Sequence, residues 1–547
     1  MKCDEEKPTC RRCRNFGVIC NGYPYLPKTQ LPQSSKARAL VPKQYSEIPS
    51  PGSTAGVYSG PRFTDQREAC YFQYYCTEIA GKIASNCRST IWDQIIPQAG
   101  GNEGFIAHGI AALGALSLSR TMSQNSLSSN RAFPGAIKSN PHFQYALAQY
   151  CKSLKSMREG LQRQIWGRTR TTLIASLVIF CIESLLNNAD SASIHASKSI
   201  SLLYQWRHQH AISDKHLCAQ DAFEEDLYPA FPGLDLQALL HLDDRPQVVH
   251  SEFQKYLDQG LEGHPKTLTT LNEGIVACQL LLRRSLHFIA AWRVLDGYPD
   301  ITKLDDSAIN GKVLWSVALG PLSIPLSKRV EQRSYLADIN RYKTALNDLL
   351  EASNQSEYSM VFYAGAICKI HTAMNTILLT GSCLPARTSC HSLLSEFHEI
   401  VTLCEQIYLQ ASSKGGSTYV FDMGLIVPLS VVAIRCRDVR LRKNAIKLLL
   451  SKPGYREGIW DAEAMGHVCK WVVTIEEEAS LDELSYVAGK IDDQGRLGKD
   501  EAAAEDKIPT LLMVHFKLND RKARAFCAVP VRGKDEELVL KETVISW

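Results

Sequence analysis

The chain has 547 residues, of which 45% are hydrophobic and 22% are charged, as in an ordinary soluble globular protein. This length exceeds one ordinary hydrophobic core and predicts two or three domains, or one large helical array with appendages. The longest apolar run, Leu173 to Leu186, is about 14 residues long and contains Glu183, whereas a bilayer span needs about 20. We therefore expect a buried helix there and no membrane partner. The charged, Cys-rich N-terminus also excludes a secretory signal.

Positive charge is concentrated at the N-terminus. The net charge of the whole chain is +4, yet residues 1–45 alone contain nine Lys or Arg and three acidic residues, a local charge of +6. A basic end on a nearly neutral body is typical of a small polyanion-binding tip. A solvated basic tail is the alternative interpretation of the charge alone.

Four of the 18 cysteines lie in residues 1–22, at the spacing Cys3-x6-Cys10-x2-Cys13-x6-Cys20. Zinc takes four ligands in a tetrahedron and favours thiolates, and closely spaced Cys pairs supply two ligands from one short turn. We therefore predict a zinc-binding module here; four unrelated thiols are the alternative. The other fourteen cysteines are scattered singly, which indicates reduced thiols in an intracellular protein.

Residues 23–62 are rich in Pro, Ser and Gly and predict a linker. From residue 63 to about residue 486 the hydrophobic period is helical. The first stripe follows Thr64, a candidate N-cap, and contains Phe72, Tyr75, Cys76, Ile79 and Ile83.

Two later segments predict close helix packing. Residues 105–118 are rich in Ala and Gly, which indicates a helix packed closely against a neighbour. The runs 173–186 and 192–206, separated by the polar joint 187–190, predict an antiparallel helix pair.

The C-terminal part changes character. Residues 487–506 are charged and contain Gly, and predict a flexible segment. In residues 507–547 the hydrophobic period becomes two, with a turn at Asn519-Asp520, which predicts a short β-hairpin. The expected fold is therefore mainly α: a small Cys-rich zinc module, a Pro-rich linker, and a large helical domain that ends in a β-hairpin.

The cysteine spacing, together with the strings Lys2-Cys3-Asp4, Lys7-Pro8 and Cys10-Arg11-Arg12-Cys13, resembles the second half of the fungal six-cysteine zinc binuclear cluster of transcription factors. The family pattern is C-x2-C-x6-C-x5-12-C-x2-C-x6-8-C. The body, on strings such as PRFTDQREACYFQYYC and KIPTLLMVHFKLNDRKARAFC, resembles the fungal-specific transcription factor domain that follows such clusters.

The resemblance implies zinc ligation by Cys3, Cys10, Cys13 and Cys20, with Cys10 as a bridging ligand. The complete family cluster holds two zinc ions, but the first two family cysteines are absent, so we expect one zinc or none in the chain as written. One zinc on all four thiols requires a rearranged fold. Either the true start lies upstream, which we favour, or the chain is a truncated paralogue.

The resemblance also implies DNA contacts. In the family the first half of the cluster reads a short GC-rich triplet, because Lys and Arg donate bidentate hydrogen bonds to guanine. Only Lys2 remains from that half. Basic residues of the second half would mainly contact phosphates, with solvated surface as their alternative. The candidate DNA-binding residues are Lys2, Lys7, Arg11, Arg12 and Arg14.

The function expected from these features is sequence-specific DNA binding and regulation of RNA polymerase II genes in a fungal nucleus, with a secondary-metabolite gene cluster as one expected target. The expected partners are double-stranded DNA and the transcription machinery, with a homodimer left open. We do not expect an enzyme, since the nucleotide-binding, zinc-protease and serine-hydrolase patterns are absent. The alternative is a helical interaction or effector-sensing protein that has lost DNA binding because half of its cluster is missing.

Overall fold

A computed structural model describes the chain over residues 63, 65–84, 90–127, 140–162, 169–213, 226–241, 243, 245–262, 267–292, 324–352, 360–382, 392–412, 419–488, 509–530 and 538–547. By its internal contacts the chain divides into two units, Met1–Tyr58 and Ser59–Trp547. All described residues belong to the second unit. The predicted zinc module (1–22) and linker (23–62) lie outside the described residues.

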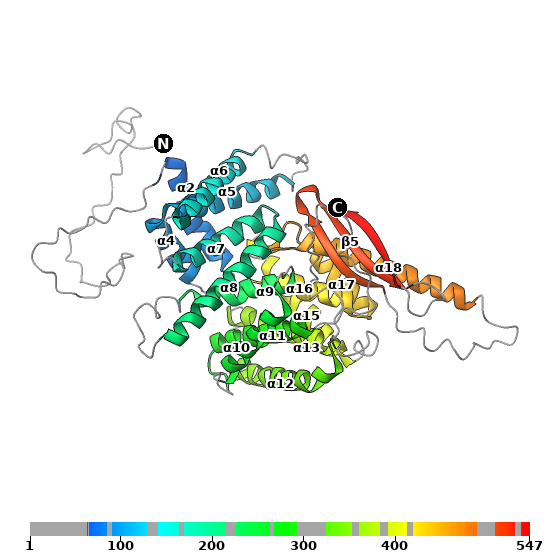
Figure 1. Cartoon of the computed structure of the whole chain (residues 1–547). Coiled ribbons are helices and arrows are strands. Elements are labelled where there is room, and N and C mark those ends of the chain that lie inside the picture. The colour runs from blue at the N-terminus through cyan, green and yellow to red at the C-terminus, as the bar shows by residue number, and fades with distance from the viewer. Residues whose placement is uncertain are drawn as a thin grey trace, which may run out of the picture. The chain divides into compact units, whose positions relative to one another are not determined.

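The described part is mainly α-helical, which confirms the predicted fold class (Figure 1). Its helices are α2 (Gln66–Tyr74), α3 (Ala80–Ile83), α4 (Ile96–Asn102), α5 (Gly104–Leu127), α6 (Pro141–Gln162), α7 (Thr169–Leu185), α8 (Ala189–Ser213), α9 (Phe231–Leu240), α10 (Gln247–Glu262), α11 (Leu271–Trp292), α12 (Arg329–Ala352), α13 (Met360–Gly381), α15 (Leu394–Ser412), α16 (Ile426–Arg435), α17 (Val439–Leu450) and α18 (Ala462–Ala488). Short helical turns also occur at Tyr75–Ile79, Ile91–Ile95, Tyr228–Ala230, Leu326–Lys328 and Leu518–Asp520.

The first predicted stripe is buried except at one position. Phe72, Tyr75, Ile79 and Ile83 are buried, but Cys76 is exposed. A π-helical turn spans Tyr75–Ile79 at this point of the helix. Asp65 is the N-cap of α2, where its carboxylate accepts a 2.7 Å hydrogen bond from the Glu68 backbone N–H.

The Ala/Gly-rich helix predicted over 105–118 is α5, and it packs against α2, α4, α6 and α7. Gly114 lies so close to α2 that a Cβ there would sit 2.3 Å from the backbone oxygen of Tyr71. Gly109 faces Val178 of α7, whose Cγ1 lies 2.9 Å from the position of such a Cβ. The small side chains therefore allow the close helix contacts that the composition predicted.

Helices α7 and α8 form the predicted pair. They pack on each other and are joined at Asn187, whose φ of 68° is left-handed and ends α7. The apolar run from Leu173 is buried in α7, as expected. Among the described helices, α11 is long and apolar enough to cross a membrane by length and composition, and 72% of its apolar window is buried inside the protein. Core helices pass the same test.

A small three-stranded sheet consists of β1 (Tyr419–Val420), β2 (Arg456–Glu457) and β3 (Trp460–Asp461), in that order. The two residues of β2 bind two helix ends. The Glu457 carboxylate accepts hydrogen bonds from the backbone N–H groups of Gly424, Leu425 and Ile426 at the start of α16, at 2.7–2.9 Å.

The neighbouring residue Arg456 is fully buried and binds the end of α7, donating to the Ser184 carbonyl and, at 2.6 Å, to Asn187 Oδ1. An anion at a helix N-terminus and a cation at a helix C-terminus are the favourable pairings with the helix dipole.

The C-terminal strands are β4 (Thr510–Lys517), β5 (Lys522–Pro530) and β6 (Leu538–Ser546), in an antiparallel sheet of order β4-β5-β6. The predicted hairpin is β4–β5, and its turn contains Asn519 and Asp520. The sequence interpretation missed β6, because LVLKETVIS is largely exposed and does not alternate cleanly. Asp190 of α8 lies 3.4 Å from His515 of β4 and ties the sheet to the helices.

We predict that Gly114→Ala destabilises the protein by about 1–3 kcal/mol, because the added methyl group meets the backbone of α2 and the two helices must separate. Thermal unfolding followed by circular dichroism measures the change. Gly104→Ala in the same helix is the control, since a Cβ there meets nothing within 4 Å, and we expect a change below about 1 kcal/mol. Equal effects of the two substitutions would contradict the close α2–α5 contact.

Candidate functional site

The nine residues predicted to bind zinc or DNA (Lys2, Cys3, Lys7, Cys10, Arg11, Arg12, Cys13, Arg14 and Cys20) lie outside the described residues. Within the described part, no group of three or more His, Cys, Asp or Glu side chains is arranged to hold a metal ion. The ten described cysteines are free thiols. The described body therefore offers a different candidate, a buried cluster of charged side chains.

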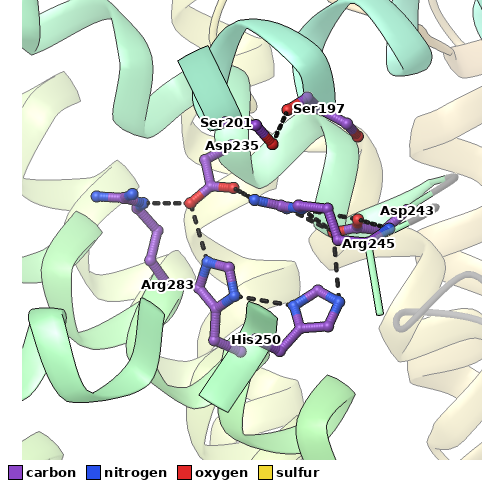
Figure 2. Close-up of polar contacts among 8 residues, drawn as sticks. Ser197, Ser201, Asp235, Asp243, Arg245, His250 and Arg283 are labelled. Carbon is purple, nitrogen blue, oxygen red and sulfur yellow. Dashed lines mark hydrogen bonds and ion pairs between the residues drawn. The ribbon is translucent and has the colours of Figure 1, made fainter. Parts of the chain in front are cut away.

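This cluster is centred on Asp235 in α9, a helix whose ten residues are all buried (Figure 2). The Asp235 side chain is 0% exposed, so its charge has to be compensated inside the protein. Arg245 Nη1 lies 2.8 Å from Asp235 Oδ1, and Arg283 Nε donates to Asp235 Oδ2 at 2.8 Å. Burial alone would raise the pKa of Asp235, but the two guanidinium groups hold it well below its usual value.

Asp243 balances the positive charge of Arg245. Arg245 Nε donates to Asp243 Oδ1 at 2.8 Å, and both side chains are buried in the segment that leads into α10. Burial would raise the pKa of Asp243, but the Arg245 charge and hydrogen bonds lower it. Two carboxylates therefore face two guanidinium groups, and the charges of the cluster balance.

Two histidines complete the cluster. His287 Nε2 lies 3.1 Å from Asp235 Oδ2, and its Nδ1 lies 3.0 Å from His250 Nδ1. Because the Asp235 carboxylate can only accept, His287 Nε2 carries the proton and His287 Nδ1 accepts from His250 Nδ1–H. The Phe253 ring stacks on His287 with centroids 4.9 Å apart.

Both imidazoles are neutral in this environment. Burial lowers the pKa of His250 to about 3: nearby Asp243 raises it, whereas His287 and Arg245 lower it. Burial also lowers the pKa of His287, against the opposing effect of Asp235. Protonation of either ring would place an extra cation beside Arg245 and Arg283, in a site where the charges already balance.

Arg284, which follows Arg283 in α11, connects the cluster to helix α12. Arg284 Nη2 donates to Asp338 Oδ2 of α12 at 2.7 Å, and its guanidinium carbon lies 4.0 Å from the centre of the Tyr335 ring. The functional groups of the cluster are thus bonded to one another and join α9, α10, α11 and α12. This arrangement suits a structural ion network that fixes helix register.

The fungal Zn(2)-Cys(6) binuclear cluster domain matches residues 1–30, which contain Cys3, Cys10, Cys13 and Cys20. The predicted resemblance is confirmed. This chain is similar to fungal zinc-cluster transcription factors. Its matched segment contains four cysteines, whereas the name of the domain counts six.

Two curated fungal regulators are similar to this chain. The transcription regulator lscL of Purpureocillium lilacinum is 21% identical over 219 residues, 39% of this chain and 49% of that protein. The aspercryptin biosynthesis cluster-specific transcription regulator atnN of Emericella nidulans is 23% identical over 448 residues, 77% of this chain and 65% of that protein. The chain thus spans about half and about two thirds of the two relatives. No solved structure matches the chain.

We predict that Asp235→Asn lowers the free energy of unfolding by about 3–5 kcal/mol, because it leaves Arg245 and Arg283 without their shared carboxylate in a buried site. Denaturant unfolding measures the effect. Asp226→Asn is the matched control, since Asp226 pairs with Arg170 at the surface and should contribute at most about 1 kcal/mol. A similar small effect at Asp235 would contradict the central role of the network.

We also predict that the protein loses stability as the pH falls below about 6.5, the ordinary histidine pKa. The folded pKa of His250 is about 3, so this ring stabilises the fold above pH 6.5 and its contribution decreases as the pH falls towards 3. The loss approaches about 1.4 kcal/mol per pH unit for one proton. The free energy of unfolding is measured between pH 7.5 and 5, above the range in which carboxylates titrate.

The matched pair for this measurement is His250→Gln and His398→Gln. The His398 side chain is exposed on α15. We expect a shallower pH dependence in His250→Gln and the wild-type dependence in His398→Gln. The same slope in all three proteins would show that His250 takes no part.

Proposed function

We propose that this chain is a fungal transcription regulator that binds double-stranded DNA through a zinc-holding module at Cys3, Cys10, Cys13 and Cys20. The observation that carries the proposal is the match of residues 1–30 to the zinc binuclear cluster domain. The names of both relatives, which are transcription regulators, support it. We further propose a nuclear location and RNA polymerase II genes as targets, with no catalytic activity.

The donor set fits zinc. Four thiolates within 18 residues form a suitable set of ligands, and for a module this small bound zinc supplies the free energy that holds the fold. The basic residues Arg11, Arg12 and Arg14 are proposed to neutralise DNA phosphates, with Lys7 beside them. Lys2 is the proposed contact to a base edge.

The target genes are proposed from the relatives. The printed name of atnN assigns it to the aspercryptin biosynthesis cluster, and the alignment with atnN covers 77% of this chain. We therefore propose that this chain regulates genes of a biosynthetic cluster. The helical body, with its fixed helix register, is proposed to serve partner contacts.

The test uses the full chain and two Cys→Ala variants. Zinc content is measured by elemental mass spectrometry, and affinity for duplex DNA by fluorescence anisotropy at 50–200 mM salt. We expect bound zinc and salt-dependent DNA affinity in the wild type, because phosphate contacts release counterions. Cys10→Ala should lose the bound zinc and most of the DNA affinity, whereas Cys151→Ala, which removes an exposed thiol of the body, should change neither.

The zinc stoichiometry distinguishes one ion on four thiols from two ions. A folded wild-type chain that binds neither zinc nor DNA would contradict the proposal. That outcome would favour a helical interaction protein without DNA binding, the reading suggested by four cysteines in place of six.

A further inference from the structure

A second concentration of positive charge lies on α17, far from the N-terminus in sequence. The helix contains four basic residues (Arg440, Arg442, Lys443 and Lys447) and no acidic one. With the preceding residues, the segment 435–447 carries six Lys or Arg and one acid, a local charge of +5. The whole chain has a net charge of only +4, whereas residues 1–45 alone carry +6. The residues outside these two segments therefore have a net negative charge.

The basic residues of this segment divide between two environments. Arg442 is buried, with Nη1 2.7 Å from Glu476 Oε2 and Nε donating to the Ala433 carbonyl at 2.8 Å. Arg437 pairs with the same Glu476. Arg442 and Arg437 therefore have structural partners, and they fasten α17 to α16 and α18 (Figure 1).

Of the other four cations, Arg435 has an interaction within the protein, and Arg440, Lys443 and Lys447 form the basic stripe of α17. All three are exposed, and their spacing of three and four residues places them on one side of the helix. Within the described part of the chain none of them forms an ion pair. The stripe runs over about 10 Å, at 1.5 Å per residue.

The stripe is electrostatically unfavourable for the helix itself. Like charges three and four residues apart repel one another, each pair at a cost of a few tenths of a kcal/mol. Arg440 also lies in the first turn, where the helix dipole disfavours a cation; only the N-cap Asp438, which accepts from Leu441 N–H at 2.9 Å, opposes this. A bound polyanion would relieve both effects.

We propose that the basic stripe of α17 binds the phosphate backbone of nucleic acid, a contact that rests on the proposed DNA-binding function and adds a second surface to it. Exposed Asn444 lies between the cations, so the face carries hydrogen-bond donors of the types that contact phosphates. A protein partner would call for an apolar or aromatic centre and few lysines, and the one large apolar side chain exposed there, Val439, lies at the end of the stripe.

The test compares two triple variants of the full, zinc-loaded chain. The first is Arg440→Gln/Lys443→Gln/Lys447→Gln. The control is Lys152→Gln/Lys155→Gln/Arg158→Gln, which removes three exposed cations from α6 and changes the net charge equally. Affinity for a random-sequence DNA duplex is measured by anisotropy from 50 to 200 mM KCl, and thermal unfolding verifies that both variants are folded.

We expect the α17 variant to bind at least 10-fold more weakly at 100 mM KCl. Its slope of log affinity against log salt should be shallower by about 2 to 3, at about 0.9 per phosphate contact. The control should behave as the wild type. Equal losses of affinity in the two variants would mean that only the net charge matters, which would contradict a specific role of the stripe. An unchanged salt slope in the α17 variant would also overturn the proposal.

The same substitutions in a Cys10→Ala background separate this proposal from the zinc-dependent function. Residual DNA binding that survives Cys10→Ala and disappears with the α17 substitutions supports the stripe, whatever the role of zinc. A wild-type chain without any DNA affinity overturns both proposals. Loss of binding to a poly-glutamate peptide, with DNA binding intact, would assign the stripe to an acidic protein instead.

Discussion

The stability of the helical body depends on the positively charged partners of one buried carboxylate, that of Asp235. Asp235 lies in a helix with no exposed residue, and two arginines and a histidine from neighbouring segments meet it there. A buried ion network of this kind contributes modestly to stability when complete and destabilises strongly when one member is removed. Its main effect is on specificity, since α10 and α11 have one register in which Arg245, Arg283 and His287 all reach the carboxylate.

Charge in this chain is segregated by role. In the interior, Arg245, Arg283 and Arg284 each form an ion pair with a carboxylate, so the positive charges of the network are neutralised. In the sequence, positive charge is also concentrated in residues 1–45, and the exposed cations of α17 form no ion pair within the described part of the chain.

Local patterns predicted much of the fold. The helical period, the Ala/Gly-rich segment of α5 and the α7–α8 pair follow from neighbouring residues, and the structure contains all three. The exposure of Cys76 and the π-helical turn over Tyr75–Ile79 were not predicted, because the stripe alone fits a regular helix. Strand β6 was missed for a similar reason: pairing with β5 stabilises it, and its own residues are largely exposed.

The proposed zinc ligands and basic DNA contacts could be named from spacing and resemblance, since they lie within 20 residues and matching them needs no three-dimensional information. The Asp235 network is different. Asp235, His250 and Arg283 come from three helices, and each is an unremarkable polar residue in its own segment. Only the apolar surroundings of Asp235, in FPGLDLQALL, could have signalled that its charge needed distant partners.

The pairing of Arg456 and Glu457 has a consequence for the order of folding. The Glu457 carboxylate, 31 to 33 residues later in the chain, accepts from the N–H groups of Gly424, Leu425 and Ile426 at the start of α16. Arg456 donates to the Ser184 carbonyl near the end of α7, from 272 positions away. Both helix ends lack these hydrogen-bond partners until β2 has formed. Contacts over such sequence separations form slowly, because the intervening chain must first be ordered. We infer that α7, α16 and β2 become native in one cooperative step, and that nascent chains shorter than about 460 residues keep both helix ends frayed.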